Sequence, residues 1–203
     1  MPNDSKYPVL EPPGSGLPLF SKWMANIGLK TYMVRSDPQK ALQHFQHLGE
    51  SFRKLIMPLS DYEGQTHVLV QPILGIEDSS RLWSPYMVLH HLVIVEKGVV
   101  EIVESLVNNK EFESEVRIAA VKPSAGTGCE VLPLFLEVER QYSDFIVQTP
   151  SLKTAKQHLR PWFGKLDAYG WHFLMALNRS VHRKQLKAIL EKLPETLRSK
   201  AGE

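Results

Sequence analysis

Cysteine is almost absent from this chain of 203 residues, in which Cys129 is the single example. A lone cysteine forms no intramolecular disulfide, and a zinc site built from several thiolates is also excluded. Cys129 lies in or beside a predicted loop, and we expect it to be inert, as lone cysteines usually are. The first residues, Met1 to Tyr7, lack the apolar run of a secretory signal. These absences lead us to expect a protein of the reducing cytoplasm.

Long apolar runs are missing as well. The best candidate, Met87 to Val95, is interrupted by His90 and His91 and is far shorter than the roughly 20 apolar residues of a membrane span. We therefore expect no membrane partner. A large excess of one charge sign is also missing, because the formal net charge is only +2, which argues against nucleic acid as a partner. Cations do gather near the end of the sequence, where we interpret them as a solvated helix face: Arg179, Arg183, Lys184, Lys187, Lys192, Arg198 and Lys200.

Four segments repeat apolar residues at the spacing of an amphipathic helix. A serine or aspartate that caps free amides, or a proline in the first turn, marks each expected start. The expected starts and ends are Asp37 and Pro58, Ser84 and Asn108, Pro133 and Thr149, and Asp167 and Pro194. On the third segment, the residues predicted to face inward are Leu134, Val138, Tyr142, Phe145 and Ile146.

Long connections join the first segment to the second and the second to the third. This order predicts an all-α four-helix bundle with long crossover connections. We expect residues 36–193 to form the bundle domain, preceded by an N-terminal arm with a short helix at 1–35 and followed by a C-terminal tail at 194–203. The connections are expected to hold short extended pieces at residues 68–70 and 116–121 and a further turn at residues 153–159.

Polar residues interrupt the inward faces of the second and fourth segments. His91 lies among valines on the second, and Asn178, His182 and Gln185 fall at i, i+4 and i+7 on one face of the fourth. Buried polar groups cost free energy unless they are paired or ligated. Two interpretations follow: hydrogen bonds among these residues, or a divalent metal held by residues from both segments. Spacing alone favours hydrogen bonds, because the amide oxygen of Asn178 is a poor zinc ligand.

Two stretches of the sequence together carry a family resemblance. The first is Trp83-Ser84-Pro85 with His91-Leu92 and Glu96, and the second is Pro161-Trp162-Phe163-Gly164-Lys165-Leu166-Asp167 with Trp171 and Asn178…His182…Gln185. Together they resemble the DinB/YfiT-like metalloenzymes, whose fourth helix reads His-x-x-x-His-x-x-Gln. The resemblance spans roughly residues 36–193. Within the family, the sequence is most similar to a branch that is defined by a domain of unknown function.

The resemblance implies a divalent metal, commonly zinc or nickel, bound by His91, Asn178 and His182. It also implies a reaction on a small molecule: transfer or isomerisation with a low-molecular-weight thiol, or hydrolysis. A homodimer through two bundle helices is a further expectation. The chain departs from the family pattern at two positions, since Asn178 replaces a metal-binding histidine and Arg160 replaces the histidine that usually precedes Pro161.

Two functional hypotheses remain open. In the first, a metal on His91 and His182, with Asn178 as a direct or water-mediated ligand, activates a thiol or water for attack on a small electrophile. Glu96 then accepts a ring N–H of His91, or forms only a surface salt bridge. In the second, the change at Asn178 has removed the metal. The bundle is then structural or holds a small ligand, and these polar residues, with Gln185, form a hydrogen-bonded network.

Overall fold

The computed structural model describes residues 10–12, 15–113 and 118–201. Most of these residues belong to five long helices: α1 (Leu19–Arg35), α2 (Pro38–Ile56), α4 (Pro85–Val107), α5 (Val131–Gln148) and α6 (Ala168–Ala201). The expectation of an all-α fold is therefore confirmed. None of the helices in the described part of the chain combines the length and apolar character needed to cross a bilayer.

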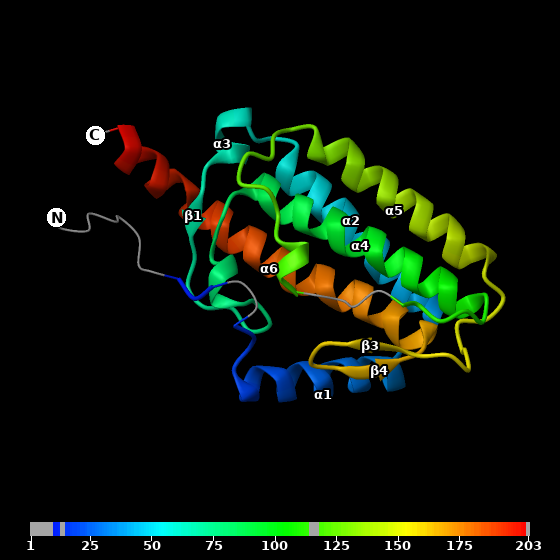
Figure 1. Ribbon diagram of the computed structural model, residues 1–203. Coiled ribbons are helices and arrows are strands. Elements are labelled where there is room, and N and C mark those ends of the chain that lie inside the picture. The colour runs from blue at the N-terminus through cyan, green and yellow to red at the C-terminus, as the bar shows by residue number, and fades with distance from the viewer. Residues whose placement is uncertain (1–9, 13–14, 114–117, 202–203) are drawn as a thin grey trace.

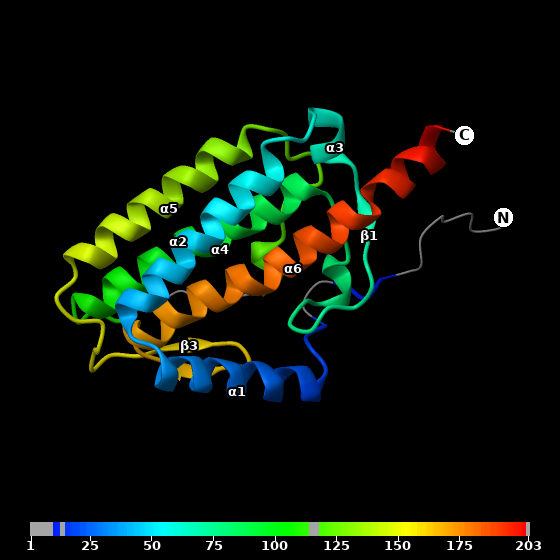
Figure 2. The same cartoon turned by 180° about the vertical axis from the view of Figure 1, so that it is seen from behind.

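The long helices α2, α4, α5 and α6 lie side by side (Figure 1). Helix α6 packs against both α2 and α4, and α4 also packs against α5. Figures 1 and 2 show that α4 and α5 run in the same direction, because the chain between them returns along the molecule. The first helix, α1, contacts α6 on the side away from α5.

Side-chain caps fix the start of three of these helices. Asp37 accepts a hydrogen bond from the Lys40 amide at 2.9 Å, and Ser84 accepts one from the Met87 amide at 3.2 Å. Asp167 accepts from the Gly170 amide at 2.9 Å. Each cap satisfies an amide that has no partner within its own helix. The predicted starts of α2, α4 and α6 are thus confirmed.

The connections contain short elements. They are α3 (Asp61–Gln65), β1 (Val68–Leu69), the 3₁₀ turn η1 (Asp78–Ser80), β2 (Leu82–Trp83), the 3₁₀ turn η2 (Ile118–Val121), β3 (His158–Arg160) and β4 (Gly164–Leu166). Strand β1 pairs antiparallel with β2, and β3 pairs antiparallel with β4. The extended piece at 68–69 is confirmed, whereas the hairpin of β3 and β4 was not predicted.

Three expectations about the termini and connections are wrong. Helix α6 continues through Pro194 to Ala201, so residues 194–201 are not a separate tail. The proline removes one backbone hydrogen bond, but Leu193 and Leu197 on either side still pack on the core. Residues 118–121 form a 3₁₀ turn where an extended piece was expected, and residues 158–160 form strand β3 where a further turn was expected. The short helix expected within the N-terminal arm is found at residues 19–35. Residues 116–117, together with 1–9 of the arm, lie outside the described part.

The inward face of α5 also differs from the predicted one. Leu134 is 47% exposed, whereas its neighbour Phe135 is fully buried. The buried positions 131, 135, 138, 142 and 146 follow the helical repeat, and Leu134 is about 100° away from Phe135 around the axis. The apolar pattern alone did not separate these two adjacent residues.

A layer of charged residues divides the apolar core into two clusters. On α4, Glu96 separates the buried residues up to Val93 from those beginning at Val99. Arg179 occupies the same level on α6, and Glu139 occupies it on α5. We call Arg179, Glu96 and Glu139 the Arg179 network.

Candidate functional site

His91 and His182 face each other between α4 and α6. Their ring centroids lie 4.4 Å apart, and the two side chains are only 8% and 5% exposed. The indole of Trp83 stacks on His182, with the planes 6° apart and the centroids at 6.0 Å. The spacing argument that placed both histidines on inward faces is therefore correct.

Hydrogen bonds fix the tautomer of each ring. The Nδ1 of His91 lies 2.7 Å from the Val121 carbonyl, which only accepts, so this nitrogen carries the proton. The amide nitrogen of Gln185 donates to the Ser80 carbonyl at 2.7 Å, which turns its oxygen toward the Nδ1 of His182 at 2.8 Å. That Nδ1 is therefore also a donor. Both rings keep an Nε2 lone pair that no described residue engages.

Both rings are neutral at pH 7. Burial lowers the pKa of His182 to about 4. Burial also holds the pKa of His91 well below its ordinary value, and the neighbouring His182, Lys122 and Arg160 add to this effect. A cation in this space is unfavourable because two positive side chains already lie close to it.

The chain between α4 and α5 is fastened to α4 by adjacent histidines. His90 is half-buried, and its Nδ1 accepts from the Ser124 amide at 3.1 Å. His91 holds Val121 as described above. Between these two anchors, Lys122 donates to Glu77 at 3.0 Å and to the hydroxyls of Ser79 and Ser80, at 2.8 Å each.

Asn178 lies one turn before His182 on α6, as the spacing predicted. Its Nδ2 is buried and has no hydrogen-bond partner among the described residues. Within the same described ranges, no three His, Cys, Asp or Glu side chains gather in a way that holds a metal ion. Two imidazole nitrogens and one amide, with Lys122 and Arg160 nearby, do not form a complete divalent-metal site.

Glu96 does not contact the histidines. It is 1% exposed, and its two carboxylate oxygens accept from Arg179 at 2.6 and 2.8 Å. Arg179 also donates to Glu139 and, at 3.0 Å, to the Phe45 carbonyl. Neither role considered for Glu96 is therefore found, and Arg179 is a core residue, contrary to the expectation of a solvated face. The periodicity of apolar residues indicates which apolar side chains are buried, but it does not indicate that a charged residue such as Arg179 is buried.

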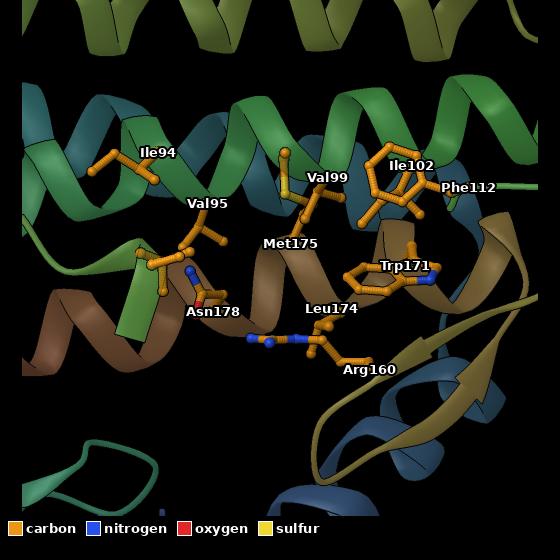
Figure 3. Close-up of a pocket in the computed structure, with 13 residues that line it drawn as sticks. Ile94, Val95, Val99, Ile102, Phe112, Arg160, Trp171, Leu174, Met175 and Asn178 are labelled. Atoms are coloured by element: carbon orange, nitrogen blue, oxygen red, sulfur yellow. The ribbon is translucent and has the colours of Figure 1, made fainter. Parts of the chain in front are cut away.

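Two spaces with shared lining residues lie near the histidines. The larger, which we call the apolar cavity, has a volume of about 250 Å³. It lies between α4 and α6, and its apolar lining includes Ile94, Val95, Val99, Trp171, Leu174 and Met175 (Figure 3). The smaller, which we call the polar pocket, has a volume of about 60 Å³ and is lined by His91, His182, Glu77 and Lys122 among others. Arg160 and Asn178 line both spaces.

Residues from the connections complete this site, and sequence reasoning missed their role. Glu77 and Lys122 come from loops with no periodic pattern, and Arg160 was noted only as a departure from the family. The hairpin that carries Arg160 bends at Trp162 and Gly164, whose φ angles of 73° and 78° lie in the left-handed region. Cys129 lies elsewhere and is exposed, and the Asp61 carboxylate raises the pKa of its thiol.

Comparison with known proteins returns no matching family model, no matching curated protein and no matching solved structure.

Proposed function

We propose that this protein binds a small, largely apolar organic molecule in the apolar cavity, without a metal. The cavity itself is the observation that carries the proposal. Its volume of about 250 Å³ exceeds the roughly 150 Å³ of an engineered protein cavity that holds benzene. Apolar walls with a few polar groups at one end are typical of small-molecule sites.

Gly98 offers a direct test of this proposal. It lines the cavity on α4, and a Cβ added there meets no other atom within 4 Å. Gly98→Leu therefore starts a bulky apolar side chain in open space at the cavity wall, and we expect it to take up part of the cavity. We expect it to weaken binding of the neutral fluorescent probe N-phenyl-1-naphthylamine at least about tenfold.

Gly28→Leu is the matched control, because Gly28 lies on α1 and its added Cβ also meets open space. This variant should bind the probe like the unmodified protein. Equal binding by the Gly98 and Gly28 variants would show that the probe does not enter the cavity, and it would overturn the proposal.

The second candidate is the metal-dependent transferase, isomerase or hydrolase implied by the family resemblance. It is favoured by the two free Nε2 lone pairs of His91 and His182, whose ring centroids are 4.4 Å apart. The third donor would come from Asn178, water or a low-molecular-weight thiol. Elemental analysis of protein purified without chelator distinguishes the candidates: one zinc or nickel per chain, lost in His182→Ala, favours the enzyme.

The family resemblance also implies a type of bundle, a cellular location and an oligomeric state, and we include these in the second candidate. The four packed helices α2, α4, α5 and α6 would form a DinB-like four-helix bundle of the cytoplasm, assembled as a homodimer. Light scattering coupled to size-exclusion chromatography gives the mass, and a monomer at 100 µM, roughly a hundred times a micromolar Kd, argues against the dimer.

A further inference from the structure

Arg160 enters the site from the end of strand β3. In Figure 3 its side chain extends past Leu174 toward Asn178, on the wall of the apolar cavity. Among the described residues, no carboxylate or carbonyl accepts a hydrogen bond from its guanidinium. Its guanidinium carbon lies 6.0 Å from a ring centroid of Trp171.

The missing partner is unusual for a cation in such a position. The Arg160 side chain is half-buried, and this burial lowers its pKa to about 10, so the group stays protonated at pH 7. Two nearby cations are neutralised by the protein itself: Lys122 by Glu77, and Arg179 by Glu96 and Glu139. Withdrawing a charge from water without a partner opposes folding. An anion from solution would remove this cost.

Asn178 adds a second free donor at the same place. Its buried Nδ2 has no partner, and the residue lines both the apolar cavity and the polar pocket, as Arg160 does. A ligand group that accepts hydrogen bonds therefore fits this boundary. Arginine presents parallel N–H groups that match the two oxygens of a carboxylate.

The surrounding charges limit the ligand to a single negative charge. Glu77 lines the polar pocket, and Lys122 already neutralises it. Arg160 is thus the cation that a ligand would meet without competition from a described carboxylate. A doubly charged phosphate would leave one charge without a partner in a space of about 60 Å³.

We propose that Arg160 and Asn178 bind the carboxylate of a small amphipathic acid, whose apolar body fills the apolar cavity. This inference rests on the proposed function, because it needs the cavity to be the binding site. It adds the chemical class of the ligand: a monocarboxylate with an aromatic or medium-length alkyl body.

Titration calorimetry at pH 7.5 with 4-phenylbutyrate and its neutral amide tests this inference. The unmodified protein should bind the acid at least about tenfold more tightly than the amide. Arg160→Met should remove this preference by weakening the acid about tenfold while changing the amide less than twofold. Lys165→Met, an exposed cation on the same hairpin, is the control for net charge and should leave both affinities unchanged.

The outcomes separate the two proposals. Equal affinities for acid and amide, both unaffected by Arg160→Met but both abolished by Gly98→Leu, would overturn the carboxylate assignment and keep the cavity as a binding site. Affinities that are insensitive to Gly98→Leu would overturn the proposed function instead. If Lys165→Met weakens the acid as much as Arg160→Met does, general charge attraction explains the preference and the assignment to Arg160 is wrong.

Discussion

Arg179 is fully buried and Arg160 is half-buried, and described carboxylates neutralise only the first. Arg179 bonds to Glu96, Glu139 and the Phe45 carbonyl, and the rings of Phe45 and Phe135 lie 3.5 and 4.6 Å from its guanidinium carbon. Arg160 has one ring at 6.0 Å and no described carboxylate.

This difference is reflected in the two pKa values. Burial pulls the pKa of Arg179 down, but attraction to Glu96 and Glu139 outweighs burial and leaves the pKa above its ordinary value. For Arg160, burial acts alone and lowers the pKa to about 10. Arg179 therefore has the ion pairs of a structural residue. Arg160 has no described carboxylate, which is the arrangement that the proposed ligand would complete.

The largest expected effect comes from removing Arg179. Arg179→Met leaves the buried carboxylate of Glu96 and the half-buried carboxylate of Glu139 without their partner, so we expect a loss of about 3–5 kcal/mol in the free energy of unfolding. Urea denaturation followed by circular dichroism measures this loss. Arg183→Met is the control on the same helix, because Arg183 bonds only to Ser51 among the described residues. Its loss should cost less than about 1 kcal/mol. Similar losses in the two variants would contradict a structural role for the network.

Gly49 should show the next largest effect. It faces the Arg179 network from α2, where an added Cβ overlaps the Glu139 carboxylate and meets Arg179 at 2.6 Å. Gly49→Ala forces these groups apart, so we expect a loss of about 3 kcal/mol. Gly28→Ala, in open space on α1, should instead stabilise by about 0.5–1 kcal/mol. The same urea denaturation compares them, and a stable Gly49→Ala protein would mean that the network tolerates displacement.

The Arg179 network also marks the limit of prediction from sequence. Helix starts were predictable because caps such as Asp37 and Ser84 act on amides two or three residues away. Glu96 and Arg179 are 83 residues apart, and each has the residue type of an exposed position. Only the packing of α4 against α6 makes them partners, so neither residue alone predicted a buried ion pair.

The candidate site divides in the same way. His91, Asn178 and His182 were predictable because helical periodicity places them on inward faces. Glu77 and Arg160 come from irregular connections, whose path depends on contacts with the finished helices. The polar half of the site therefore became visible only in the structure, as did the apolar cavity beside it.

The polar pocket beside Arg160 should make the free energy of unfolding depend on pH, through the buried ring of His182. His182 has a folded-state pKa of about 4, below the roughly 6.5 of an unfolded histidine. The unfolded chain thus binds the proton more readily, and stability that is complete above pH 6.5 falls as the pH approaches 4. We expect His182 to contribute about 2 kcal/mol of loss between pH 7 and pH 5.

Urea denaturation across this pH range checks the contribution. His182→Leu should reduce the loss between pH 7 and pH 5 by about 2 kcal/mol, whatever its effect at pH 7. His47→Leu should leave it unchanged, because the ring of His47 is exposed to solvent before and after unfolding. An unchanged pH dependence in His182→Leu would mean that this ring is not held neutral by its surroundings.

The smallest expected effect is that of Arg160→Met, which should increase the free energy of unfolding. Arg160→Met removes a half-buried charge and keeps a side chain of similar reach, so we expect a gain of about 1 kcal/mol in the free energy of unfolding without ligand. With saturating 4-phenylbutyrate the unmodified protein should instead be more stable than Arg160→Met, because a ligand stabilises only the protein that binds it. Thermal unfolding with and without the acid measures both parts. A clear loss of stability in ligand-free Arg160→Met would make Arg160 a second structural arginine, and the contrast with Arg179 would disappear.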